Sequence, residues 1–191
     1  SWLMHHGLDS ITCLYGCSLG GAVVARMLAT RKISVDCAVI DGGMTPYQLW
    51  KPLTYLIGIR DFIMLEIGKH MSIKALRGMF DPEKYTENDV AYIKEAMSGM
   101  SAKTIWHSFY SCNNYSMPKS APSINCRIAY WYGSAEKGPR KWDIAYIRKM
   151  FPHAQIIENA GMDHAEFFTL HPEEFCKKLT AWIHLSARDK R

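Results

Sequence analysis

Short apolar runs alternate with longer amphipathic segments along most of the 191-residue chain. Four of the runs contain β-branched or aromatic residues and are too short for helices, so they predict buried strands. These runs span residues 11–15, 35–40, 127–132 and 154–158. Three longer segments with apolar residues at helical spacing span 19–29, 139–150 and 172–186. This alternation is typical of an α/β domain with a mostly parallel sheet.

Residues 44–118 break the alternation, because their pattern predicts helices alone. Three helix starts are marked by residues that commonly cap helices. They are Thr45 with Pro46 as the first helical residue, Thr86 with Asp89 in a capping box, and Ser101. We therefore predict a single α/β domain, residues 1–191, that carries a helical insert at 44–118.

The composition is that of a globular domain able to bury a core, since 48% of the residues are hydrophobic and 21% are charged. Charged residues interrupt the longest apolar segments, so no stretch of about 18 uncharged apolar residues exists to span a membrane. The net charge is +5, but no basic stripe interleaved with aromatic residues accompanies it. The sequence therefore argues against a nucleic-acid partner, and it leaves the oligomeric state open.

The six cysteines form no CxxC pair, and several of them fall in predicted strands. This pattern predicts buried thiols rather than a disulfide framework or a zinc site. It is typical of a reducing, cytoplasmic compartment, although a missing amino-terminal segment would hide a targeting signal. We expect the site to use neither a metal nor a cofactor.

Gly16, Ser18 and Gly20 form a GxSxG pattern, GCSLG, between a predicted strand and a predicted helix. A bare match arises by chance in roughly one chain of this length in twenty, so the flanking elements carry the prediction. A serine in a sharp strand-to-helix turn projects its hydroxyl away from the sheet, which makes Ser18 the candidate nucleophile. We expect Gly16, Gly20 and Gly21 where the strand and the helix nearly touch. The backbone N–H of Leu19 is then placed to stabilise an oxyanion.

His164 is the candidate base among the eight histidines. It lies in a short loop, GMDH, just past the last predicted strand and before the helix that Pro172 opens. Active sites of α/β proteins assemble in loops at the carboxyl ends of strands. The other histidines lie in or beside predicted helices, at the start of a strand, or ahead of the strand that leads to Ser18. They are therefore less well placed.

A carboxylate that orients the imidazole is expected at the end of an earlier strand. Glu136 follows the third predicted strand and is the preferred acid. Asp41 ends the second predicted strand and is the alternative, since a carboxylate there reaches the same imidazole or caps a turn. Asp163 ranks last, because a residue adjacent to His164 has difficulty turning back onto the ring.

The order of nucleophile, acid and histidine, with the motifs GCSLGG, YGSAE and GMDHAEFF, resembles the α/β-hydrolase superfamily. The resemblance implies a catalytic triad of Ser18, Glu136 and His164. The acid is more often Asp in that family, so Glu136 departs from the pattern and Asp41 stays open. The resemblance also implies that an insert at residues 44–118 acts as a cap or lid over the active site.

Only about ten residues precede the strand that leads to Ser18, where the family has several strands and helices. We therefore expect a fragment that lacks on the order of 80 amino-terminal residues, including the family's second oxyanion donor. His6 and Gly7 lie too close to Ser18 to supply that donor, and Gly7 is expected to end a short helix. The strand before Ser18 would then form an apolar sheet edge. The isolated chain is expected to be weakly active or inactive.

The resemblance implies a serine hydrolase that cleaves a small, largely apolar acyl ester through an acyl-enzyme intermediate. Two alternatives stay open. The same triad serves amide, thioester or carbon–carbon bond hydrolysis and acyl transfer to an alcohol. A noncatalytic member of the fold would instead bind a ligand, and fold analogy does not choose among these functions.

Overall fold

The structure, a computed structural model, describes residues 2–30, 32–119 and 124–188. The chain divides into two compact units, which are described separately below. One unit comprises Ser1–Pro46 and Tyr115–Arg191, and the other comprises Tyr47–Asn114.

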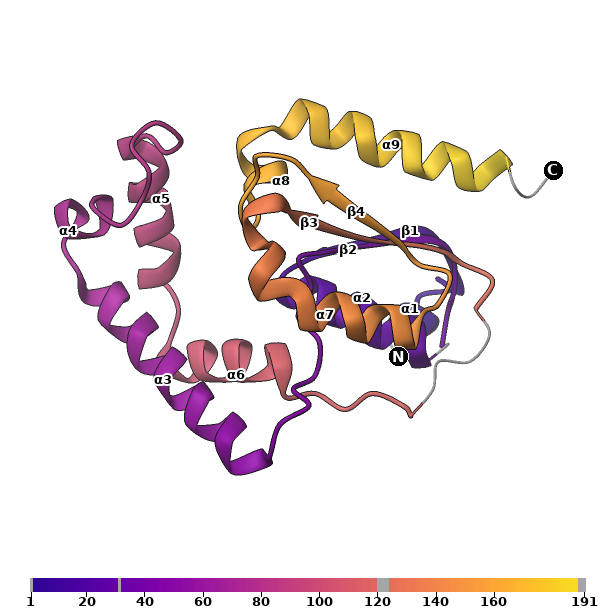
Figure 1. The fold of residues 1–191 in the computed structure, drawn as a ribbon, viewed down its shortest axis with the longest axis horizontal. Coiled ribbons are helices and arrows are strands. Elements are labelled where there is room, and N and C mark those ends of the chain that lie inside the picture. Colours follow the sequence, from indigo (N-terminus) through magenta and orange to yellow (C-terminus); the bar gives the residue numbers. More distant parts are fainter. Residues whose placement is uncertain (1, 31, 120–123, 189–191) are drawn as a thin grey trace. The chain divides into compact units, whose positions relative to one another are not determined.

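In the described residues, the first unit contains a four-stranded parallel sheet with the strand order β1-β2-β3-β4 (Figure 1). The strands are β1 (Ser10–Cys17), β2 (Ser34–Asp41), β3 (Arg127–Gly133) and β4 (Gln155–Asn159). All four predicted strands are confirmed, each within one or two residues of its predicted ends. Because the strands are parallel, their carboxyl ends lie along one edge of the sheet, and β1 lies at one side of it.

Helices cover both faces of this sheet (Figure 1). They are α2 (Leu19–Thr30) and α7 (Lys137–Met150) on one face, with α8 (Glu166–Leu170) and α9 (Pro172–Arg188) on the other. Successive side chains of a strand point to opposite faces. In β2, Ala38 and Ile40 therefore pack with α2 and α7, whereas Cys37 and Val39 pack with α8 and α9. The α/β fold class and its three predicted helices are confirmed.

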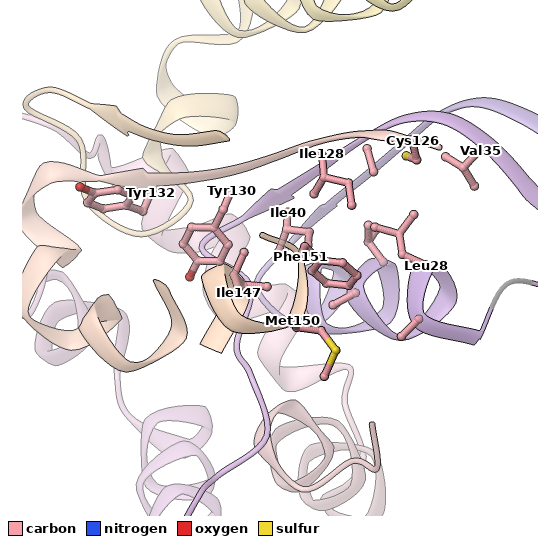
Figure 2. Packing of buried hydrophobic residues seen from close by; sticks show 14 residues of the cluster. Leu28, Val35, Ile40, Cys126, Ile128, Tyr130, Tyr132, Ile147, Met150 and Phe151 are labelled. Carbon is pink, nitrogen blue, oxygen red and sulfur yellow. The ribbon is translucent and has the colours of Figure 1, made fainter. Parts of the chain in front are cut away.

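The face toward α2 and α7 carries a large apolar core (Figure 2). Ile128 and Tyr130 of β3 are fully buried in one cluster with Ile147 of α7 and Phe151. Burying an aliphatic or aromatic side chain of this size contributes about 1.5–3 kcal/mol. The cluster therefore fixes β3 and α7 firmly, and with them the short segment that connects the two elements.

The opposite face is held by aromatic rings. Trp131 of β3 lies 6.0 Å from Phe167 of α8, and Phe167 lies 5.8 Å from Phe175 of α9, measured between ring centroids. Tilted and edge-on pairs at these distances are favourable beyond the area they bury. These ring contacts anchor α8, which begins directly after the loop that follows β4.

A short helix, α1 (Trp2–His5), precedes β1. Gly7 has a φ of 69°, and the N–H of Leu8 donates to the carbonyl of Leu3 at 3.0 Å. A glycine in the left-handed region followed by a backward hydrogen bond is a common helix end. The prediction that Gly7 ends a short helix is therefore confirmed.

The secondary-structure elements of the second unit are all helices. Its helices are α3 (Lys51–His70), α4 (Ile73–Arg77), α5 (Glu87–Ser98) and α6 (Ala102–Asn113). α3 packs on α6 at Gly58, where an added methyl group would lie 2.7 Å from the ring of Tyr110. Trp106 stacks on Tyr110 with ring centroids 5.1 Å apart. Glycine at this position thus lets α3 approach α6 closely, and the aromatic rings of α6 pack against it.

Two of the three predicted helix starts in this segment are confirmed. Thr86 and Asp89 form a reciprocal capping box at α5, and the hydroxyl of Ser101 accepts a hydrogen bond from Thr104 N at 3.1 Å. The third prediction is wrong, because α3 begins at Lys51 and not after Thr45. Thr45 is buried in the first unit, where its side chain has a different partner. No helix in the described part of the chain combines the length and apolar character needed to cross a bilayer.

The six cysteines are free thiols. Three of them, Cys37, Cys112 and Cys126, are buried as predicted, whereas Cys176 is exposed on α9. The prediction is wrong for Cys176 because its position on α9 faces solvent rather than the sheet. Within the described ranges, no group of three or more His, Cys, Asp or Glu side chains is arranged to hold a metal ion.

Candidate active site

Ser18 forms the turn between β1 and α2 and has a φ of 54°. A residue other than glycine rarely adopts this left-handed conformation, and it persists only where the surroundings enforce it. The N–H of Ser18 donates to the carbonyl of Asp41 at 2.9 Å, and the carbonyl of Ser18 accepts from Ala22 N at 3.3 Å. These bonds fasten the turn to the end of β2 on one side and to the first turn of α2 on the other.

Two of the three glycines predicted at this turn are sterically required. A methyl group on Gly16 would lie 2.3 Å from the carbonyl oxygen of Gly20, and one on Gly21 would lie 2.5 Å from the Cα of Gly43. Gly20 also lies at this close approach, but glycine is not sterically required there, because an added methyl group would meet nothing within 4 Å. Gly20 approaches the strand with its carbonyl, and its Cα faces open space. Leu19 is the first residue of α2.

Glu136 and His164 are joined by a hydrogen bond of 2.7 Å between Oε1 and Nδ1. Glu136 closes a single 3₁₀ turn, η1 (Ser134–Glu136), directly after β3, and His164 lies in the loop after β4. β3 and β4 are neighbours in parallel register, with Gly133 opposite Asn159. Segments that follow the ends of neighbouring parallel strands lie side by side, which brings the acid to the imidazole.

Backbone contacts lock the turn after β3 to the loop of His164. The N–H of Ala135 donates to the carbonyl of Met162 at 3.1 Å, and Gly161 N donates to the hydroxyl of Ser134 at 2.9 Å. A methyl group on Gly133 would lie 2.3 Å from the carbonyl oxygen of Met162. The YGSAE and GMDH motifs therefore form one interlocked structure.

The loop also fixes the backbone of His164. Oδ1 of Asp163 accepts from His164 N at 2.7 Å, and a carboxylate oxygen of Glu166 accepts from Asp163 N at 2.8 Å. Ala165 has a φ of 64°, a second residue other than glycine in the left-handed region. The carboxylate of Asp163 thus accepts from the backbone of His164 rather than from its imidazole ring. This contact agrees with its last rank among the candidate acids.

The alternative acid, Asp41, is buried at the end of β2 and has another partner. Its Oδ2 accepts a hydrogen bond of 2.7 Å from the hydroxyl of Tyr15. Burial raises the pKa of Asp41, although the hydrogen bond from Tyr15 opposes this effect. The structure therefore brings Glu136, and not the carboxylate of Asp41, into hydrogen-bonding contact with His164.

Gly42 links the turn of Ser18 to the pair formed by Glu136 and His164. It follows Asp41, whose carbonyl accepts from Ser18 N, and its own N–H donates to the carbonyl of Trp131 at 2.8 Å. A methyl group on Gly42 would lie 3.3 Å from Oε2 of Glu136 and would press on the imidazole ring. Ser18, Glu136 and His164 thus gather at the carboxyl edge of the sheet around Gly42.

Two further charged residues reach this site, and the sequence analysis missed both. Arg140, on the first turn of α7, donates from Nε to Oε1 of Glu136 at 2.7 Å and from a terminal nitrogen to Oδ2 of Asp143 at 3.2 Å. Oδ1 of Asp143 accepts both the N–H and the hydroxyl of Thr45, each at 2.7 Å. The spacing of four residues between Glu136 and Arg140 was the available signal, since residues at i and i+4 are neighbours on a helix.

The electrostatics of Glu136 follow from these contacts. Its burial opposes ionisation, but hydrogen bonds from His164 and Arg140 and their positive charge outweigh it and lower the pKa of Glu136 to about 2. Gly133 N adds a longer hydrogen bond of 3.3 Å to Oε2. Glu136 is therefore a carboxylate at any pH near neutrality.

The fold is similar to that of several solved structures. An α/β-hydrolase family protein from Desulfitobacterium hafniense aligns with a TM-score of 0.64 at 18% identity, over 94% of this chain and 72% of that chain. A carboxylesterase from Nitrososphaera gargenis aligns with a TM-score of 0.67 at 15% identity, over 98% and 70% of the two chains. A bromoperoxidase from Bacillus anthracis aligns with a TM-score of 0.65 at 15% identity, over 96% and 70%.

No protein-family model and no curated protein matches the sequence. At identities of 15–18%, the likeness to solved structures shows the fold alone. The parallel sheet, the helices on both of its faces and the extent of these alignments agree on one architecture. The chain therefore has the α/β-hydrolase fold.

Proposed function

We propose that this chain is a serine hydrolase that cleaves an ester-type acyl substrate. Ser18 is the nucleophile, His164 the general base and Glu136 the acid that orients the imidazole. The observation that carries the proposal is the 2.7 Å hydrogen bond between Glu136 and His164, at the same sheet edge as the turn of Ser18. The similarity to a carboxylesterase favours an ester as the substrate class.

The first step follows from the state of the imidazole. In the neutral imidazole that donates from Nδ1 to Glu136, the opposite nitrogen, Nε2, carries no proton and accepts the proton of the Ser18 hydroxyl. The serine oxygen then attacks the acyl carbon, and the imidazolium returns its proton to the leaving alcohol. Attack by a water molecule, activated in the same way, releases the acid and restores Ser18.

Fixed groups of the chain stabilise the charges that develop during the reaction. Glu136 stays ionised throughout because its pKa is about 2, so it stabilises the imidazolium without taking its proton. Leu19 is the first residue of α2, where an N–H has no acceptor in the helix's own ladder and the helix dipole is positive. Its amide is our candidate donor to the oxyanion.

The helical unit Tyr47–Asn114 enters this proposal as the cap of the site. The chain leaves the first unit after Pro46, a few residues past Asp41 and Gly42, and returns at Tyr115 before β3. We assign the role from this position between the strands that carry site residues.

Covalent labelling with a fluorophosphonate probe tests the proposal, because such probes react with activated serines. The wild-type chain should carry one adduct at Ser18 by peptide mass spectrometry, and Ser18→Ala should carry none. Ser18→Ala should also lower turnover of p-nitrophenyl acetate by at least about 10³-fold. Ser98→Ala, which removes an exposed hydroxyl on α5, is the matched control and should behave as wild type. A folded wild-type chain that is not labelled at Ser18 would contradict the proposal.

A further inference from the structure

We infer that Arg140 is a positioning residue of this site. Its guanidinium fixes the carboxylate of Glu136 in the orientation that His164 requires, and Asp143 fixes the guanidinium in turn. The inference rests on the proposed function, in which Glu136 is the acid of the triad. It begins from one oxygen atom. Oε1 of Glu136 accepts two hydrogen bonds of 2.7 Å, one from Nδ1 of His164 and one from Nε of Arg140.

The carboxylate of Glu136 needs a fixed point other than the imidazole. A glutamate side chain has a rotatable bond that an aspartate lacks, so it loses more conformational freedom when its carboxylate is held. The bond to His164 cannot supply the fixed point, because the imidazole is the group that Glu136 has to orient. In the described part of the chain, the other hydrogen bonds to this carboxylate come from Arg140 and, at a longer 3.3 Å, from Gly133 N. The bond from Arg140 is the short, charge-assisted one.

Arg140 is itself held in place. Its side chain is only 12% exposed, and one terminal nitrogen donates to Oδ2 of Asp143 at 3.2 Å. The other terminal nitrogen lies 3.5 Å from Nδ1 of His164, so the guanidinium lies beside the ring. A guanidinium is planar and presents its donors in a rigid fork. Carboxylates on two of its nitrogens therefore set its orientation.

Asp143 anchors this arrangement to the segment that follows β2. It is buried, and its Oδ1 accepts both the N–H and the hydroxyl of Thr45, each at 2.7 Å. The contacts thus run without a break from Thr45 through Asp143 and Arg140 to Glu136, and all four residues belong to the first unit. A carboxylate held by a buried network that is fixed at its far end reorients less than one held by a mobile surface side chain.

The functional consequence is the rate of the chemical step. Proton transfer from Ser18 requires the imidazole in one orientation, and a small misplacement of a reacting group slows a reaction strongly. The guanidinium is nearly buried, and its short hydrogen bonds are with Glu136 and Asp143. We therefore expect Arg140 to act on kcat, through the position of Glu136, rather than on the binding of substrate.

Hydrolysis of p-nitrophenyl acetate by the full chain tests the inference, with kcat taken from the pH range in which it no longer changes with pH. Arg140→Gln should lower this kcat about 10–100-fold and change KM less than about threefold. Arg140→Lys keeps the charge but not the planar fork, so it should recover part of the lost kcat. Arg148→Gln makes the same change at an exposed position in the last turn of α7 and should behave as wild type. An unchanged kcat in a folded Arg140→Gln variant would overturn the inference.

A double-mutant cycle separates positioning from a general effect on the fold. In the Glu136→Gln background Arg140 has no carboxylate to hold, so adding Arg140→Gln should lower kcat by less than about threefold. Equal losses with and without the carboxylate would overturn the inference. Asp143→Asn keeps Arg140 but weakens its outer anchor, and it should also lower kcat. It replaces Arg140→Gln should that variant fail to fold, and an unchanged kcat in Asp143→Asn would then overturn the inference.

The three-bond NMR couplings of the Glu136 side chain supply a readout that needs no catalysis. They should report one rotamer in the wild-type chain and an average over several rotamers in Arg140→Gln and Asp143→Asn. A single rotamer in all three proteins would overturn the inference. Failure of the serine labelling with the expected averaging refutes the proposed function alone. Labelling of Ser18 with neither the averaging nor the loss of kcat refutes the role of Arg140 alone.

Discussion

Gly42 and His164 approach each other so closely that a methyl group on Gly42 would lie 3.0 Å from Nδ1 of the imidazole and 3.1 Å from its Cε1. Gly42 also has a φ of 52°, in the left-handed region. The glycine is thus required twice, once by its own backbone and once by the ring that packs on it. An added methyl group at this position must therefore shift the ring by a few tenths of an ångström.

Gly42→Ala should therefore lose both stability and activity. The left-handed backbone costs an alanine about 1 kcal/mol, and displacement of the imidazole by a fraction of an ångström should lower kcat/KM roughly 100-fold. Urea unfolding and ester turnover measure the two effects. Gly7→Ala is the matched control, because Gly7 has a φ of 69° and open space around it. Equal activity of the two variants would contradict the prediction.

The assignment of the acid is tested by comparing two amide substitutions. Glu136→Gln removes the charge that orients His164 and lets the ring adopt the wrong tautomer, so kcat should fall about 10³–10⁴-fold. Asp41→Asn changes a carboxylate whose hydrogen bond is with Tyr15, so kcat should fall less than about tenfold. The measurement is ester turnover near pH 8.

The reverse result would be decisive. If Asp41→Asn abolished turnover while Glu136→Gln retained it, Asp41 would be the acid and the contact between Glu136 and His164 would be structural. Tyr15→Phe serves as a control for Asp41→Asn, because it removes the same hydrogen bond and leaves the carboxylate in place. Circular dichroism of each variant separates loss of chemistry from loss of fold.

Glu136 should also make stability depend on pH in the acidic range. Its pKa is about 2 in the folded chain against an ordinary value of 4.5. Between these values the unfolded chain binds more protons, so the stabilisation is complete above pH 4.5 and is lost as the pH falls toward 2. The loss amounts to about 3 kcal/mol. Urea unfolding at pH 6 and pH 3 should show about 2 kcal/mol of this loss.

In Glu136→Gln the difference in unfolding free energy between pH 6 and pH 3 should shrink by about 2 kcal/mol. Asp41 acts in the opposite direction, because its raised pKa costs stability as the pH rises, and the charge of Glu136 contributes to that raised pKa. Glu83→Gln removes one exposed carboxylate and should leave the difference unchanged. If the unfolding free energy of Glu136→Gln differed between pH 6 and pH 3 as much as that of the wild type, the ionic role of Glu136 would be contradicted.

The strands and the residues at their ends are local features, and the sequence predicts them well. Glu136 and His164 each follow a strand, and that much is read from alternating apolar runs. Their contact depends on β3 and β4 being neighbours in the sheet. Sequence order does not state which strands are adjacent, so the choice between Glu136 and Asp41 needed the structure.

The sequence does not predict the buried contact of Arg140 with Glu136 and His164, for a related reason. An acid and a base four residues apart are common on solvated helix surfaces, where such pairs contribute little. Here α7 packs against β3 and excludes water from the pair, which turns an ordinary spacing into a buried contact with His164. Gly20 shows the opposite case, in which a residue of the GxSxG pattern has room for a side chain at its Cα.

Thr45 marks the clearest failure of local reasoning and gives a last prediction. A threonine before a proline looks like a helix cap, but its amide and hydroxyl both donate to Asp143, 98 residues away, at 2.7 Å. Thr45→Val removes a buried hydrogen bond to a charged group, so the unfolding free energy should fall by about 1.5–3 kcal/mol. Ser72→Ala, at an exposed cap of α4, should cost about 1 kcal/mol or less. Urea unfolding in which Thr45→Val costs no more than Ser72→Ala would show that the buried contact is not stabilising.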